Sequence, residues 1–161
     1  MKKKKIYVLM LSRLFPASHP KAGERTYFRE KIVVAGKLSS RQVDFPKLHT
    51  IRANYEFWKK RMEEIQRGEA ILSIRQWEGK PYRSKQAEIL QLGAEDGIGI
   101  QQLLYEDKLF EDDFFKVNGQ GVDIIQLAHN DGLTFDNWAD WFKHYDLSKP
   151  LAIIHFTPFR Y

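Results

Sequence analysis

Two strand-like segments in the middle of the chain constrain its fold more than any other feature. The segments EAILSIRQW (69–77) and YRSKQAEILQL (82–92) contain strand-forming residues and are joined by the turn-forming EGKP. Strands joined by so short a connection must pair antiparallel, because a parallel crossover needs a dozen or more residues. We therefore expect a hairpin with strands at Ala70–Trp77 and Tyr82–Leu92.

Further strands are expected at both ends of the chain, with helices between them. The apolar runs Ile6–Leu11 and Leu151–Thr157 are of strand length. Apolar periodicity and capping residues predict helices near 26–35, 54–66 and 134–145, with a further helical segment at 122–132. Strands and helices do not alternate strictly, which disfavours a doubly wound sheet. The sequence thus predicts an α+β fold around a small, curved, largely antiparallel sheet or barrel.

The totals suit one globular domain. The chain has 161 residues, of which 43% are apolar and none is cysteine, so disulfides, thiolate zinc sites and cysteine nucleophiles are excluded. The N-terminal MKKKKIYVLMLSRLF is similar to a signal peptide, but Arg13 interrupts its apolar run and no small-residue cleavage site follows. We expect a cytoplasmic protein without a membrane partner.

Charge is distributed unevenly along the chain. Residues 1–85 hold 21 Lys and Arg against 8 Asp and Glu, whereas residues 86–161 hold 5 against 13. The basic half suits a polyanion or a phosphorylated ligand, although the two halves could also neutralise each other within the fold. The candidate nucleic-acid surface is Lys59, Lys60 and Arg61, and the candidate stacking residues are Trp58, Trp77 and Tyr82.

The segment KLHTIR at 47–52 concentrates side chains that can do chemistry. Lys47 and Thr50 would point to opposite faces of a strand, but in a turn they can converge. Pro46 before them and the predicted helix cap at Asn54 favour a turn. We therefore expect a turn or knuckle here that brings both side chains to one site.

Such a site could bind or convert a carbonyl compound. A partly desolvated Lys47 could act as a base or polarise a carbonyl group, and Thr50 could be a nucleophile or position the substrate. A carboxylate would be needed nearby to hold the lysine or carry a proton. Arg52 fits an anion clamp, and His49 is a candidate binding residue that could equally be a packing residue.

The motif resembles the ASCH branch of the PUA-like superfamily. KLHTIR is followed by a short helix, by the step Gly68–Glu69–Ala70–Ile71 into a strand, and by a closing hydrophobic strand LAIIHF. The resemblance covers residues 5–12 and 45–157, and its specific part is the K-x-x-T-I-R knuckle. It implies a PUA-like β-pseudobarrel with peripheral helices, formed by a single domain over 1–161. The acidic and aromatic residues around 93–121, which show no clear period, would then be a divergent insertion.

The resemblance also implies an activity. Similar small bacterial ASCH proteins are acetylcytidine amidohydrolases that use a lysine, a threonine and a glutamate. The first two correspond to Lys47 and Thr50, and the third to Asp131, which is one methylene shorter; Glu88 is an alternative carboxylate. Other members of the superfamily bind RNA or modified bases without hydrolysing them.

We therefore expect a pocket for a modified nucleoside or single-stranded RNA, either catalytic or purely binding. Neither a cofactor nor a metal is expected, because His129 with Asp131 and His144 with Asp146 each lack a third ligand at a suitable spacing.

Overall fold

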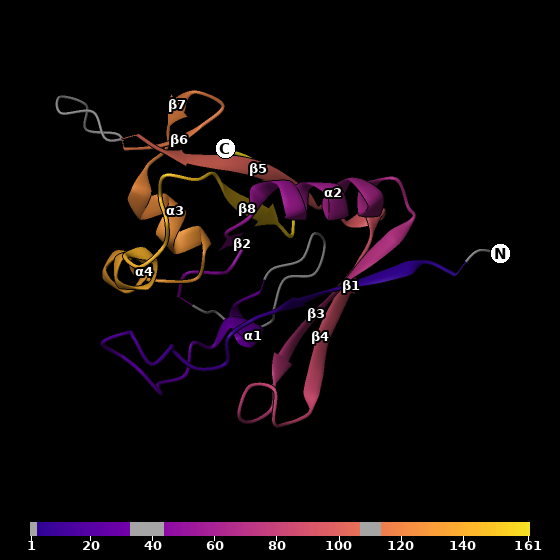
Figure 1. Cartoon of the computed structure of the whole chain (residues 1–161), viewed down its shortest axis with the longest axis horizontal. Coiled ribbons are helices and arrows are strands. Elements are labelled where there is room, and N and C mark those ends of the chain that lie inside the picture. The colour runs from indigo at the N-terminus through magenta and orange to yellow at the C-terminus, as the bar shows by residue number, and fades with distance from the viewer. Residues whose placement is uncertain (1–2, 33–43, 107–113) are drawn as a thin grey trace.

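In the described residues, two β-sheets and four α-helices make up the fold (Figure 1). The computed structural model describes residues 3–32, 44–106 and 114–161. The first sheet has the order β1-β3-β4 and the second the order β2-β8-β5-β6-β7. The strands are β1 (Lys5–Met10), β2 (His49–Arg52), β3 (Ala70–Trp77), β4 (Gln86–Leu92), β5 (Gly99–Tyr105), β6 (Phe115–Val117), β7 (Gln120–Gly121) and β8 (Leu151–His155). The helices are α1 (Phe28–Lys31), α2 (Tyr55–Gln66), α3 (Ile124–Asn130) and α4 (Phe135–Phe142), with a 3₁₀ turn at Ala94–Asp96.

The predicted central hairpin is confirmed. Strands β3 and β4 pair antiparallel, with a register shift between Ile74 and Arg75, and β1 joins the other edge of β3 in parallel. Strand β4 begins at Gln86, later than the expected Tyr82, because Tyr82 has a φ of 64° and cannot continue a strand. The α+β class and the largely antiparallel pairing are therefore confirmed.

The second sheet is antiparallel throughout and was only partly expected. Its strands β2 and β5 flank β8, so segments far apart in the sequence lie side by side. Strand β5 lies inside the region 93–121, which shows no clear period, and pairs with β8 on one side and β6 on the other. Within the three described ranges the strands form two open sheets, and no closed barrel is present.

The helix termini follow the predicted caps unevenly. Thr134 accepts a hydrogen bond from the backbone N–H of Asn137, as expected of an N-cap, and Asp123 caps α3 in the same way. Asn54 precedes α2 but has a φ of 65° and makes no capping bond. Helix α1 is shorter than the predicted 26–35; residues 33–35 lie outside the described residues.

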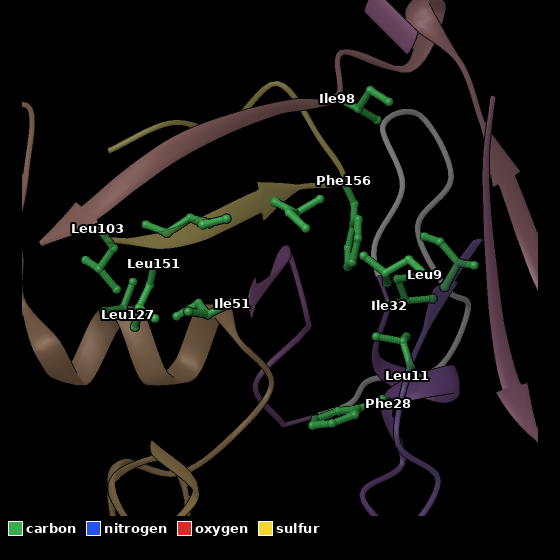
Figure 2. Close-up of a cluster of buried hydrophobic side chains, with 14 of the residues drawn as sticks. Leu9, Leu11, Phe28, Ile32, Ile51, Ile98, Leu103, Leu127, Leu151 and Phe156 are labelled. Atoms are coloured by element: carbon green, nitrogen blue, oxygen red, sulfur yellow. The ribbon is translucent and has the colours of Figure 1, made fainter. Parts of the chain in front are cut away.

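A shared hydrophobic core joins the two sheets. Figure 2 shows Phe156, which follows β8, pointing toward Ile32 and toward Leu9 of β1. These three side chains are at most 8% exposed. Their burial, at roughly 25 cal/mol per Å² of apolar surface, holds β1, the end of α1 and the segment after β8 together. None of the helices that the structure describes is long and apolar enough to cross a membrane.

Candidate functional site

Lys47, Thr50, Arg52 and Asp131 line one cavity of about 90 Å³, which we call the inner cavity. Its wall is completed by aromatic side chains from α1, from α4 and from the segment after α4, among them Phe28, Trp141 and Tyr145. The residues expected to converge, Lys47, Thr50 and Asp131, are thus brought to one place. Their catalytic roles remain predictions.

The route to this convergence differs from the expected one. The predicted turn over 47–50 is wrong: the chain bends at 44–45, where Phe45 has a φ of 55°, and is then extended. The N–H of Lys47 donates to the carbonyl of Lys31, and β2 pairs with β8 from His49 onward. Pairing with β8 favours an extended chain over a turn, and the long lysine side chain then reaches Asp131.

Lys47 and Asp131 form a buried ion pair at the end of α3. The Lys47 Nζ lies 2.8 Å from Asp131 Oδ1 and 2.8 Å from the Asp131 main-chain oxygen. The two residues are only 1% and 3% exposed, and the same Nζ lies 4.1 Å from the centre of the Phe28 ring. A cation here also satisfies a carbonyl at a helix C-terminus, which the helix dipole favours. The lysine is therefore held as part of the fold as well as of the cavity.

Burial shifts the acid–base properties of both partners. Burial lowers the pKa of Lys47, against the opposing effect of Asp131. For Asp131, burial acts to raise the pKa, but the charge of Lys47, followed by His49, outweighs it, so the pKa of Asp131 lies below its usual value. Asp131 is therefore an ionised carboxylate, and Lys47 gives up its proton more readily than an exposed lysine.

His49 lies behind the ion pair and does not face the inner cavity. It is fully buried, and its Nδ1 lies 3.7 Å from Asp131 Oδ1, beyond hydrogen-bonding distance. Its Nε2 lies 2.6 Å from the Tyr161 hydroxyl, which accepts a hydrogen bond from Asn130. Because burial lowers the pKa of His49, the imidazole is neutral. His49 therefore packs behind Asp131 and does not line the inner cavity.

Arg52 is the second cation in the wall of the inner cavity. Its Nε donates to Thr50 Oγ1 at 3.3 Å, and its Nη2 donates to the Met10 carbonyl. In the part of the chain that the structure describes, no Asp or Glu forms an ion pair with it. Burial lowers the pKa of Arg52, although an arginine stays charged at neutral pH. With the Lys47 charge balanced by Asp131, the inner cavity carries one net positive charge and favours an anion or a carbonyl oxygen.

Trp77 and Tyr82 line a second, larger pocket of about 420 Å³, which we call the outer pocket. Arg52 and Ser12 belong to the walls of both, so the two spaces adjoin. Trp58, by contrast, is in neither wall among the described residues; its ring packs against Phe57 on α2. Of the three expected stacking residues, Trp77 and Tyr82 thus line the outer pocket and Trp58 does not.

The basic residues of α2 lie apart from this site. Lys60 is exposed and Lys59 is half-buried. The Arg61 guanidinium lies over the rings of Tyr7 and Phe57, at 4.7 and 4.0 Å from their centres. Such contacts hold Arg61 against the protein and reduce its freedom to reach a phosphate.

The alternative carboxylate, Glu88, does not line the inner cavity and has other hydrogen-bond partners. It lies on β4, where it accepts hydrogen bonds from Ser73 and Gln91. Both hydrogen bonds lower the pKa of Glu88, and the one from Ser73 has the larger effect. Asp131 is the carboxylate that the fold places beside Lys47.

Several residues of the site could not be found from sequence motifs. Tyr161 reaches the His49 network from the end of the chain, and Ser12 enters the cavity wall after β1. Trp141 lies on α4, within the helix expected near 134–145, and lines the cavity. No local pattern marks these residues, since their roles depend on contacts between distant segments.

Among the described residues, no group of three or more His, Asp or Glu side chains is arranged to hold a metal ion. Comparison with protein-family models, curated proteins and solved structures finds no match to this chain.

Proposed function

We propose that this protein recognises an acylated nucleobase in the inner cavity and hydrolyses its amide bond, as an amidohydrolase of the N4-acetylcytidine type. The observation that carries the proposal is the buried Lys47–Asp131 pair, which shares one cavity with Thr50 and Arg52. The KLHTIR motif supports kinship with the ASCH branch of the PUA-like superfamily, which is part of the same proposal. A pseudobarrel relationship would require the two largely antiparallel sheets, which are open within the described residues, to correspond to the two parts of a partly open barrel.

The charges at the cavity suit the chemistry of amide hydrolysis. Oxygen from water, or first from a Thr50 hydroxyl, bonds to the acetyl carbon, and the carbonyl oxygen becomes negative. The charge of Arg52 and the amine of the buried Lys47 would stabilise that oxygen. The C–N bond then breaks, and the base nitrogen takes the proton given up by the attacking hydroxyl and leaves as the free amine. When water attacks, acetate is released directly. When Thr50 attacks, the acetyl group stays on its oxygen as an ester until a water molecule hydrolyses it to acetate and restores the hydroxyl.

Each polar group has a defined part in this scheme. Lys47, with its lowered pKa, transfers the proton or stabilises the oxyanion, and Asp131 holds the lysine and carries the compensating charge. Thr50 either attacks the carbonyl or holds the attacking water; its Oγ accepts from Arg52, so its own hydrogen remains available for donation. A transient acetyl group on Thr50, sought by rapid quench and mass spectrometry, separates the two routes.

Activity on N4-acetylcytidine tests the proposal. Wild-type protein should release cytidine and acetate, and added chelator should leave the rate unchanged. Lys47→Met, which keeps the length of the side chain but removes its charge, should lower the rate by at least about 100-fold. Lys60→Met makes the same chemical change on exposed α2 and should retain the wild-type rate. Intact acetylcytidine beside folded wild-type protein would rule out hydrolysis of this substrate.

A binding protein without hydrolysis is the second candidate. Asp131 is one methylene shorter than the glutamate that the resemblance implies, and its Oδ1 is already engaged by Lys47. A displacement of about 1 Å can cost about 100-fold in rate, so this geometry could bind a base without converting it. Saturable binding of acetylcytidine without release of cytidine would favour this second function.

A further inference from the structure

The inner cavity is too small to enclose the whole of a nucleoside. Its volume of about 90 Å³ is well below the roughly 300 Å³ at which ligand pockets usually begin, whereas the outer pocket has about 420 Å³. Arg52 and Ser12 form part of both walls. The adjoining outer pocket therefore offers space, past Arg52, for the rest of a ligand whose reacting end enters the inner cavity.

The outer pocket presents aromatic surface suited to stacking. The rings of Trp77 and Tyr82 have centroids 5.3 Å apart and planes inclined at 50°. Tyr82 is 89% exposed and has a left-handed backbone, so a large aromatic ring is held in solvent at the edge of the pocket. Pro16 and Ala17 also line the pocket. A planar ring entering here could stack on Tyr82.

The surroundings of the pocket are basic. Its described lining contains Arg13 and Arg52 and no acidic residue. The turn between β3 and β4, residues 78–85, adds three exposed basic side chains against one acidic one. The hairpin extends to the lower edge of the molecule in Figure 1, so its turn is accessible. Aromatic and basic side chains mixed along one path are the features with which proteins hold single-stranded nucleic acids.

We infer that the substrate is a base within a single-stranded oligonucleotide rather than a free nucleoside. This inference rests on the proposed function of the inner cavity and adds the substrate class. One base occupies the inner cavity with its acyl group beside Arg52, the connecting sugar and phosphate cross the wall that the two spaces share, and the neighbouring nucleotide fills the outer pocket with its base on Tyr82. The basic turn meets the following phosphates, so the strand contacts the β3–β4 hairpin instead of α2.

Binding of a fluorescein-labelled cytidine hexaribonucleotide, measured by anisotropy at low salt, tests the inference. Removal of one base–aromatic stack usually costs about 1–3 kcal/mol, so Tyr82→Ala should weaken binding by about five- to 150-fold. Tyr82→Trp keeps an aromatic ring and should bind like wild type. The matched control is Tyr27→Ala, because Tyr27 is also exposed and also left-handed, with a φ of 60°, but lies immediately before α1, outside the outer pocket. It should bind like wild type.

The outcomes separate this inference from the proposed function. If wild type shows no saturable binding, or if Tyr82→Ala and Tyr27→Ala agree within twofold, the oligonucleotide inference is wrong. Hydrolysis of free acetylcytidine by wild type would still stand in that case. Conversely, Tyr82-dependent binding of the oligonucleotide without any hydrolysis would support the inference and remove only the catalytic part of the proposed function.

Discussion

Removing the charges of Lys47 and Asp131 one at a time should destabilise the protein far more than removing them together. Each residue is almost fully buried, so a single replacement leaves the other charge without its partner. An uncompensated buried charge typically costs 3–5 kcal/mol. The charge can also be relieved by a proton. At pH 7, protonating a carboxylate of reference pKa 3.8 costs about 4 kcal/mol, and deprotonating an amine of reference pKa 10.5 costs about 5 kcal/mol. Both of these proton-transfer costs fall within the range of about 3–5 kcal/mol for an uncompensated buried charge.

The expected free energies of unfolding follow from these limits. Lys47→Met and Asp131→Leu should each lower stability by about 3–5 kcal/mol, so additive behaviour would give a loss of about 6–10 kcal/mol. The double variant contains no stranded charge and should lie within about 2 kcal/mol of wild type, since apolar replacement of a buried pair is often neutral. The coupling energy between the two sites should therefore be at least about 4 kcal/mol.

Urea unfolding at pH 7 of wild type, both single variants and the double variant measures this coupling. The exposed pair Arg67 and Glu69 provides the control cycle; its nitrogen–oxygen distance is 3.1 Å, but both side chains are more than half exposed. That cycle should give a coupling below about 1 kcal/mol. If the Lys47 and Asp131 replacements add to within about 0.5 kcal/mol, the two charges do not stabilise each other and the reasoning fails.

Three further predictions concern pH and the surroundings of the site. Because the folded-state pKa of Asp131 is lowered, its contribution to the free energy of unfolding is fully present above the unfolded pKa of 3.8 and is lost as the pH falls through the folded value. Urea unfolding of wild type should show this loss, and urea unfolding of the double variant should lack the part due to Asp131. Tyr161→Phe strands two buried polar side chains and should lower stability by about 1–3 kcal/mol in the same assay. Gly132→Ala places a methyl group 3.2 Å from Lys47 Cβ at a φ of 83°, so its melting temperature should fall further than that of Gly23→Ala, which has the same φ and open space around it. Equal shifts for the two glycine variants would show that the contact with Lys47 is harmless.

The sequence by itself determined the features that depend on neighbouring residues. The β3–β4 hairpin follows from two strand-forming segments and a short turn, and the start of α4 follows from the hydroxyl of Thr134. Lys47 and Thr50 could also be selected as candidate site residues, because their residue types and their spacing are local properties. Local hydrogen bonds and side-chain periodicity are encoded within a few positions, so they can be predicted from the sequence.

Only the tertiary structure decided what lies beside these residues. Lys47 meets Asp131 across 84 positions of sequence, and β2 becomes a strand because β8, about a hundred residues later, offers it a partner. The same pairing turns His49 away from the cavity. Such contacts carry no local signature: their free energy comes from burying apolar surface and from pairing charges between segments that meet only in the folded chain.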